Sequence, residues 1–311
     1  MVKHVLTIAD LTKEEIAVII NLAADMKANK PKYLNALPRK SVCCIFEKPS
    51  LRTRVSLEVG CHELGAHAIY YNTRDSPMGA KETIEDTGIV LSRMTNAITA
   101  RVMSRETLVK LASVATVPVI NALDDWAHPM QMLADLLTIV EVRGSYEGMT
   151  LTFAGDLDNN MTFDLMRTAG VCGFNIRLAG VGDIPKAVTE ECTALNLKSG
   201  GTFTFCATVD EAVLGADVVY CDSWMSYGIS KDKEAARIAA FLPFQVNAAV
   251  MAKAKPTAVF MNCLPAVRGM EQTAEVIDGP QSVVFQQAEN RVHSVKALLV
   301  FLVNGMVVVT A

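Results

Sequence analysis

Short apolar runs alternate along this chain with longer segments in which apolar residues recur at helical spacing. In the first such segment, Thr7 to Lys27, Thr12 and Glu15 have the spacing of a capping box. The segment therefore predicts an amphipathic helix. From Ser41 onward the pattern predicts β-strands that alternate with α-helices. This alternation indicates parallel sheets covered by helices on both faces.

The expected elements form two series. The first series has strands at 41–46, 67–72, 97–102 and 117–122, and helices at 52–64, 82–95, 104–114 and 128–142. A polar, glycine-bearing stretch from Val142 to Gly148 then interrupts the pattern. The second series has strands at 149–154, 175–181, 202–206, 217–221 and 257–262, and helices at 159–172, 186–196, 208–214, 232–240 and 244–253. A long helix from about 286 to 304 closes the chain.

Two such series predict an α/β protein with two doubly wound parallel-sheet domains and a cleft between them. We expect residues 1–142 to form the first domain, 143–285 the second, and 286–311 a C-terminal helix. In parallel sheets ligands gather at the carboxyl ends of the strands. Residues that directly follow a strand are therefore the candidates for a functional site.

The composition narrows the classes of function. The chain has 311 residues, of which 51% are hydrophobic and only 6% aromatic, as in α/β enzymes with buried parallel sheets. Its net charge of −4 argues against nucleic acid as a partner. No apolar run has the length of a membrane span. The N-terminal residues lack the features of a signal or transit segment, so we expect a cytoplasmic protein.

The cysteines and glycines argue against metal and nucleotide sites. The eight cysteines are scattered without metal-ligand spacing, and we expect reduced, buried thiols. The chain has no Walker loop, and its glycine-bearing stretch at 179–183 lacks the third glycine of a dinucleotide fingerprint. We therefore expect no cofactor.

An anion-binding motif follows the strand at 41–46. The stretch Phe46 to Arg54 carries a lysine, two hydroxyls and two guanidiniums, and Ser50 is placed to cap the following helix. Backbone N–H groups at a helix start and several charged donors together suit a phosphate. The alternative is an ordinary surface helix start whose arginines are solvated or paired with Glu47 and Glu58.

Other polar residues follow other strands. Arg101 ends the strand at 97–102, and His128 and Gln131 lie three apart at the start of a helix with Asp135 one turn later. Taken alone, Arg101 also fits a solvated surface arginine, and His128 also fits a helix cap or a core hydrogen bond. Further strand ends and the start of the last helix carry Gly155-Asp156 with Asn159-Asn160, Asp222 to Gly228, Asn262-Cys263-Leu264-Pro265 and Ala288-Glu289-Asn290-Arg291.

Taken in order, these motifs resemble those of the aspartate/ornithine transcarbamylase family, and of its ornithine-specific members in particular. The resemblance spans nearly the whole chain. It implies an N-terminal carbamoyl-phosphate domain, an ornithine domain, and a last helix that returns to the first domain. It also implies a homotrimer, or a multiple of trimers, and transfer of a carbamoyl group from carbamoyl phosphate to L-ornithine in arginine metabolism.

The resemblance also implies a role for each motif residue. The phosphate ligands would be Ser50, the backbone of Leu51, Arg52, Thr53 and Arg101. The carbamoyl group would be held by His128, Gln131 and Arg291, with Arg291 also near the phosphate. The ornithine ligands would be Asn160, Asp222, Ser226, Tyr227, Cys263 and the carbonyl of Leu264. Cys263 has no histidine spaced to activate it as a nucleophile. The resemblance implies direct attack by the amine, with no covalent intermediate.

Four positions depart from the family pattern. Leu51 stands where the phosphate loop commonly has threonine, and Asn262 replaces the histidine common before Cys-Leu-Pro. Tyr227 replaces a common methionine. Pro77 stands where relatives place a side chain that reaches a neighbouring subunit's site, and Lys81 is a candidate to reach there instead.

These departures leave alternatives open. One is a sister enzyme that carbamoylates putrescine, N-acetylornithine or aspartate. Asp222 and Ser226 favour a free α-amino acid, and an aspartate site would need more basic groups in the second domain. Another is a catalytically weak relative that serves as a binding or scaffold protein. A nucleotide-dependent two-domain enzyme is disfavoured by the missing glycine loop.

Overall fold

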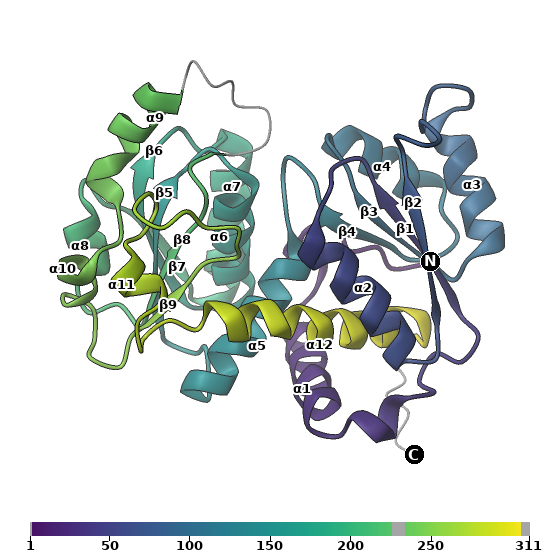
Figure 1. The fold of residues 1–311 in the computed structure, drawn as a ribbon, viewed down its shortest axis with the longest axis horizontal. Coiled ribbons are helices and arrows are strands. Elements are labelled where there is room, and N and C mark those ends of the chain that lie inside the picture. The colour runs from purple at the N-terminus through teal and green to yellow at the C-terminus, as the bar shows by residue number, and fades with distance from the viewer. Residues whose placement is uncertain (1, 226–233, 306–311) are drawn as a thin grey trace. The chain divides into compact units, whose positions relative to one another are not determined.

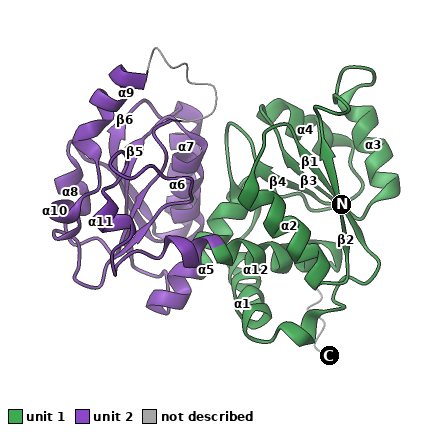
Figure 2. Cartoon of the chain, in the orientation of Figure 1, with its two compact units in different colours: residues 1–137, 289–311 green, residues 138–288 purple. Residues whose placement is uncertain are grey.

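The computed structural model describes residues 2–225 and 234–305, and its ribbon is drawn in Figure 1. The chain divides into two compact units, coloured separately in Figure 2. Unit 1 comprises Met1–Leu137 and Glu289–Ala311, and unit 2 comprises Thr138–Ala288. Each unit has one parallel sheet with helices around it, so the predicted α/β class with two doubly wound sheets is confirmed.

Unit 1 contains a four-stranded sheet in the order β2-β1-β3-β4, with all pairs parallel. The strands are β1 (Ser41–Phe46), β2 (His67–Asn72), β3 (Ala97–Arg101) and β4 (Val119–Leu123). The helices are η1 (Ile8–Asp10), α1 (Lys13–Ala28), η2 (Lys30–Tyr33), α2 (Leu51–Glu63), α3 (Ile84–Met94), α4 (Arg105–Val114), α5 (Pro129–Arg143) and α12 (Val284–Val303). Helices α5 and α12 each include residues of both units, and most of α12 belongs to unit 1.

Local signals in the sequence set several of these elements. The Thr12 hydroxyl accepts the Glu15 N–H at 3.2 Å, and the Glu15 carboxylate accepts the Thr12 N–H at 2.8 Å. The predicted capping box therefore starts α1. On one face of the sheet, buried residues of β1 and β3 pack against Leu108 and Leu111 of α4. The alternation of side chains along buried strands places the remaining core residues on the other face.

Unit 2 contains a five-stranded parallel sheet in the order β7-β6-β5-β8-β9. The strands are β5 (Thr150–Asp156), β6 (Asn175–Val181), β7 (Thr202–Phe205), β8 (Val218–Cys221) and β9 (Val259–Met261). The helices are α6 (Asn160–Cys172), α7 (Lys186–Ser199), α8 (Val209–Val213), α9 (Glu234–Phe241), η4 (Leu242–Phe244), α10 (Ala248–Met251) and α11 (Ala274–Ile277).

Two predicted elements of unit 2 are shorter than expected. Within the helix expected at 244–253, only the four-residue α10 is α-helical, and Asn247 caps its start. The 3-10 turn η4, which has Pro243 near its start, ends at Phe244. The strand expected at 257–262 is the three-residue β9. Helix α11 has four residues, too few to show a helical period in the sequence.

The strand orders place a topological switch point in each unit. In unit 1 the chain adds β2 on one side of β1 and then β3 and β4 on the other, so the order reverses between β1 and β3. In unit 2 the reversal lies between β5 and β8. Loops that leave adjacent strands in opposite directions open a crevice at this point, where α/β proteins bind ligands.

The glycine-bearing stretch at 179–183 has a packing role in unit 2. A Cβ on Gly180 would lie 1.8 Å from the carbonyl oxygen of Gly155, at the carboxyl ends of β6 and β5. Gly180 is therefore required for the close approach of these two strands.

None of the eight cysteines forms a disulfide, and six of them are buried. Among residues 2–225 and 234–305, no helix combines the length and the apolar character that a bilayer span requires.

Candidate active site

In unit 1 the segment after β1 forms the capped start of α2. Ser50 is the N-cap, and its hydroxyl accepts the Thr53 N–H at 3.4 Å and donates to the Thr53 hydroxyl at 3.1 Å. The first backbone N–H groups of the helix point out of this end and favour an anion. The Leu51 side chain is 74% exposed, so Leu51 can contribute only its backbone N–H here.

The two arginines of the motif separate. Arg54 lies on the exposed side of α2, where its Nε donates to Glu58 at 2.8 Å and its guanidinium lies 3.8 Å from the centre of the Tyr70 ring. The alternative interpretation of the motif, a surface arginine paired with Glu58, thus holds for Arg54. Arg52 is instead close enough to His128 for its charge to lower the pKa of that imidazole.

His128 is brought to this cluster by a turn after β4. The buried Asp124 carboxylate accepts the N–H groups of Trp126 at 2.8 Å and Ala127 at 2.7 Å, which folds the chain back toward α5. Pro129 is the first residue of α5, so His128 directly precedes the helix.

The His128 imidazole is neutral at neutral pH. Its side chain is buried, and burial lowers its pKa well below the usual value. The guanidiniums of Arg291, Arg101 and Arg52 lower it further, in that order. Arg101 ends β3, adjacent to β1 at the switch point. Nearby, burial and the charge of Arg101 lower the pKa of Lys48. Cations from three elements thus surround one neutral hydrogen-bond donor.

Arg291 ties this cluster together. From α12 it donates to the Gln131 carboxamide oxygen at 2.6 Å and to the Thr53 hydroxyl at 3.2 Å. Gln131 in turn donates to Asp135 at 2.8 Å. All four side chains are buried. We name the group Ser50, Arg52, Thr53, Arg101, His128, Gln131 and Arg291 the anion cluster.

In unit 2 the residues after β8 and β9 meet. The Cys263 thiol donates to Asp222 Oδ1 at 3.1 Å, and the Ser223 N–H donates to the same oxygen at 2.7 Å. Burial raises the pKa of Asp222 to about 6, and the negative charges of Glu271 and Asp156 contribute in the same direction. A cationic ligand beside Asp222 would be favoured by all three carboxylates.

The turn that follows Cys263 has an uncommon backbone conformation. Leu264 has φ of 59°, in the left-handed region, and the peptide bond between Leu264 and Pro265 is cis. A left-handed conformation costs a leucine about 1–3 kcal/mol. The Leu264 N–H donates to Asn262 Oδ1 at 2.7 Å, a bond that helps to maintain this conformation.

Comparisons with known proteins identify the family of each half of the chain. Residues 3–141 match the family model described as "Aspartate/ornithine carbamoyltransferase, carbamoyl-P binding domain", and residues 147–302 match "Aspartate/ornithine carbamoyltransferase, Asp/Orn binding domain". The chain belongs to the aspartate/ornithine carbamoyltransferase family.

Relatives in this family resemble the chain over nearly its full length. An ornithine carbamoyltransferase of Anoxybacillus flavithermus is 47% identical over 96% of both chains, and one of Methanosarcina acetivorans is 44% identical over 98% of this chain and 100% of its own. Among solved structures, the ornithine carbamoyltransferase from Pyrococcus furiosus has a TM-score of 0.93 at 41% identity and covers 97% of each chain. The Giardia lamblia enzyme has a TM-score of 0.89 at 41% identity and covers 97% of this chain and 98% of its own.

Most predicted site residues of this carbamoyltransferase lie either in the anion cluster of unit 1 or around Asp222 and Cys263 of unit 2. Every predicted residue of unit 1 belongs to the anion cluster except Leu51, whose side chain points to solvent. Asn160 is the first residue of α6, and its neighbour Asn159 is the cap, accepting the Thr162 N–H at 2.9 Å. The predicted ligands Ser226 and Tyr227 lie outside the described residues.

Some polar residues near Asp222 were not predicted. The Arg237 guanidinium forms an ion pair with Asp156 and donates to the carbonyl of Trp224. The buried Glu271 carboxylate accepts the N–H groups of Trp224 at 3.2 Å and Val267 at 3.0 Å. Neither residue directly follows a strand, so the strand-end rule could not identify them. Asn262 does carry a local signal, because an asparagine side chain often accepts the backbone N–H two residues later and so predicts a turn.

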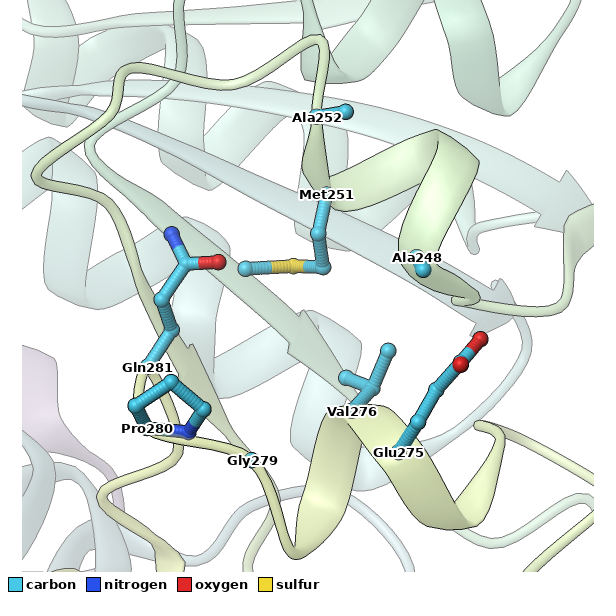
Figure 3. A pocket seen from close by; sticks show the side chains of 8 residues that line it. All are labelled: Ala248, Met251, Ala252, Glu275, Val276, Gly279, Pro280 and Gln281. Carbon is cyan, nitrogen blue, oxygen red and sulfur yellow. The ribbon is translucent and has the colours of Figure 1, made fainter.

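Unit 2 has a further pocket between α10 and α11, shown in Figure 3. Its walls are mostly apolar, and Met251 extends across it toward Gln281. The Gln281 amide donates to the Ala258 carbonyl at 2.9 Å. The charged residue of the lining is Glu275. None of the predicted site residues lines this pocket.

Proposed function

We propose that this carbamoyltransferase transfers the carbamoyl group of carbamoyl phosphate to the side-chain amine of L-ornithine, giving L-citrulline and phosphate. In this proposal residues 1–142 bind carbamoyl phosphate, 143–285 bind ornithine, and 286–311 pack on the first domain. The observation that carries the proposal is the convergence of three guanidiniums on the neutral His128 beside the start of α2.

The anion cluster suits a phosphate joined to a carbonyl. Ser50, Thr53, Arg52, Arg101 and the Leu51 N–H would hold the phosphate oxygens. His128, Gln131 and Arg291 would hold the carbamoyl group. Because Gln131 already uses one amide hydrogen for Asp135, its second hydrogen is the one left for substrate.

The residues around Asp222 suit an amino acid with a positive charge. Asp222 and Asn160 would bind the α-amino and α-carboxyl groups, together with Ser226 and Tyr227. The Cys263 thiol and the Leu264 carbonyl would position the side-chain amine. An aspartate substrate would bring a second carboxylate toward Asp222, Glu271 and Asp156, so this sister activity is disfavoured.

The reaction is direct attack without a cofactor. The amine nitrogen forms a bond to the carbamoyl carbon, the bond from that carbon to the phosphate oxygen breaks, and the amine proton leaves with phosphate or solvent. Guanidiniums and the His128 N–H stabilise charge that develops on the carbonyl oxygen and the departing phosphate. Because His128 is neutral, it donates a hydrogen bond and keeps its proton.

The free energy gained by positioning the two substrates exceeds the free-energy cost of deprotonating the amine. An alkyl amine with a pKa near 10.4 is protonated at pH 7, and freeing its lone pair costs about 4–5 kcal/mol. Bringing amine and carbamoyl carbon together in the correct orientation recovers roughly 7–11 kcal/mol. The net effect favours reaction once both substrates are bound.

The assembly and location belong to the same proposal. We propose a homotrimer, or a multiple of trimers, in the cytoplasm. Exposed apolar residues on one side of unit 1 support an assembly: Leu51, Val55 and Val59 on α2, and Ile69 on the edge strand β2. Lys81 is exposed and would reach a neighbouring subunit in place of Pro77. Light scattering of the purified protein tests the trimer.

One assay tests the activity. The purified chain is incubated with carbamoyl phosphate and, separately, L-ornithine, putrescine, N-acetylornithine and L-aspartate, and ureido products are measured. We expect product with ornithine at a rate at least a hundredfold above the others. A higher rate with another amine would replace ornithine by that amine, and no product with any amine would reject catalysis.

A further inference from the structure

Asn262 occupies the position before Cys263 and is completely buried. Its Oδ1 accepts the Leu264 N–H at 2.7 Å, and its Nδ2 donates to Gln272 Oε1 at 3.2 Å and to the Cys221 sulfur at 3.5 Å. Its backbone N–H donates to Gln287 Oε1 at 3.0 Å. Every polar group of the Asn262 side chain is thus directed to a named partner inside unit 2.

The surrounding amides fix which way Asn262 points. Gln272 donates through Nε2 to the Val267 carbonyl at 3.3 Å, so its oxygen is turned to Asn262 and to the Cys221 thiol, which donates to it at 3.3 Å. Gln287 likewise donates to the Tyr220 hydroxyl at 3.0 Å and presents its oxygen to the Asn262 N–H. Each oxygen faces a donor only in this arrangement. The Asn262 oxygen must therefore face Leu264.

The bond from Leu264 to Asn262 spans the residue that carries the thiol. A side-chain oxygen that accepts the N–H two residues later closes a turn of the asparagine type around Cys263. The same turn holds Leu264 in its left-handed conformation and determines the direction of the Leu264 carbonyl. The Cys263 thiol, from the middle of this turn, reaches Asp222.

We propose that Asn262 is a positioning residue for the amine substrate, which acts by holding the turn at Cys263 and Leu264 through its bond to the Leu264 N–H. Asn262 contacts neither substrate in this role. It sets the direction of the two groups that receive the side-chain amine. The inference rests on the proposed function for its substrate, while the turn itself can be tested without activity.

A carboxamide suits this position for an electrostatic reason. Asp222, Glu271 and Asp156 already place three carboxylates close together. A carboxylate at position 262 would accept the Leu264 N–H but would add a buried negative charge and lose the donors to Gln272 and Cys221. A neutral imidazole could accept the N–H through one ring nitrogen and donate through the other.

The kinetic test compares three variants with the wild type. Asn262→Leu removes the acceptor at similar volume, and Asn262→His restores a ring nitrogen as acceptor. Asn247→Leu is the matched control, since Asn247 also accepts a backbone N–H, from Val250 at 3.0 Å, but caps α10. KM and kcat are measured at pH 8 for ornithine and for carbamoyl phosphate.

We expect Asn262→Leu to raise the KM for ornithine at least tenfold and to leave the KM for carbamoyl phosphate within threefold of wild type. Asn262→His should recover at least tenfold in kcat/KM for ornithine over Asn262→Leu. Asn247→Leu should stay within threefold of wild type for both substrates. Equal losses for both substrates in Asn262→Leu, or no recovery with histidine, would overturn the proposal.

A second measurement is independent of activity. Amide hydrogen exchange at Leu264 in the wild-type protein should be slow, because the N–H is bonded to a buried oxygen. Exchange should accelerate at least tenfold in Asn262→Leu and be unchanged in Asn247→Leu. Fast exchange in wild type, or protection retained in Asn262→Leu, would reject the role of Asn262. A wild-type protein without carbamoylation activity but with this exchange pattern would reject only the proposed function.

Discussion

Arg291 and Gln131, 160 positions apart in the sequence, form a buried hydrogen bond of 2.6 Å between the guanidinium Nη1 and the carboxamide oxygen. Through the same guanidinium, α12 also reaches Thr53 of α2. The start of α2 and the start of α5 are therefore held by a residue from the last helix. Because Arg291 also acts on His128, one side chain connects the proposed phosphate and carbamoyl ligands.

We expect Arg291→Gln to lower kcat by about 10²- to 10³-fold, because it removes a donor that stabilises charge in the transition state. Steady-state kinetics at saturating substrates measure this. Arg54→Gln is the control, since Arg54 is exposed and paired with Glu58, and it should stay within twofold of wild type. Comparable losses in both variants would mean that the anion cluster is wrongly assigned.

Arg101→Gln should weaken carbamoyl phosphate far more than ornithine. A hydrogen bond to a charged group contributes about 1.5–3 kcal/mol, which corresponds to roughly a 10- to 150-fold rise in the KM for carbamoyl phosphate. The KM for ornithine should change less than threefold. Initial rates with each substrate varied in turn decide this, and equal effects on the two substrates would exclude Arg101 from the phosphate site.

His128 should make stability depend on pH in the mildly acid range. The unfolded chain binds a proton at His128 below about pH 6.5, whereas the folded protein, with its lowered pKa, does not. The unfolded state therefore binds more protons, and the contribution of His128 to stability is lost as pH falls below about 6.5.

The melting temperature of the wild type and of His128→Gln, measured from pH 5 to pH 8, tests this. The difference between the two proteins should narrow toward the acid end. Parallel curves would mean that the pKa of His128 is not lowered in the folded protein.

Asp222 should act in the opposite sense. With its pKa raised to about 6 by burial, the folded protein retains a proton that the unfolded chain has released, so stability falls as pH rises from about 4 to about 6. Asp222→Asn should then be more stable than wild type at pH 8 by about 1–3 kcal/mol, and similar to it at pH 4.

Denaturant titrations at the two pH values measure that gain. The same variant should lose ornithine affinity, because it lacks the negative charge proposed to face the α-ammonium group. An Asp222→Asn protein with no gain at pH 8 would show that the carboxylate is not destabilised by burial.

The rate should rise with pH until the bound amine has titrated. Free amine is the attacking species, and its fraction grows tenfold per pH unit below its pKa. A profile of kcat at saturating ornithine, which reports ionisations in the bound complex, should increase from pH 6 toward pH 10 and then level. A flat profile would exclude a rate set by free amine.

The sequence predicted the elements that depend on local chemistry. The capping box at Thr12 and the cap at Ser50 each satisfy backbone groups within a few residues, so they form independently of the rest of the chain. The alternation of strands and helices likewise predicted both parallel sheets. Where local signals were weak, the predicted bounds of α10 and β9 were too long and α11 was not predicted.

Only the tertiary structure determined which partner each polar side chain contacts. Arg52 and Arg54 are the same residue type, but residues two apart on α2 face different sides of the helix. Arg52 lies near the buried His128, and Arg54 pairs with the exposed Glu58. The pKa values of His128 and Asp222 depend on burial and on charges distant in sequence. The hydrogen bonds of Asn262 to Gln272 and Cys221 likewise require the packing of unit 2, which no local pattern encodes.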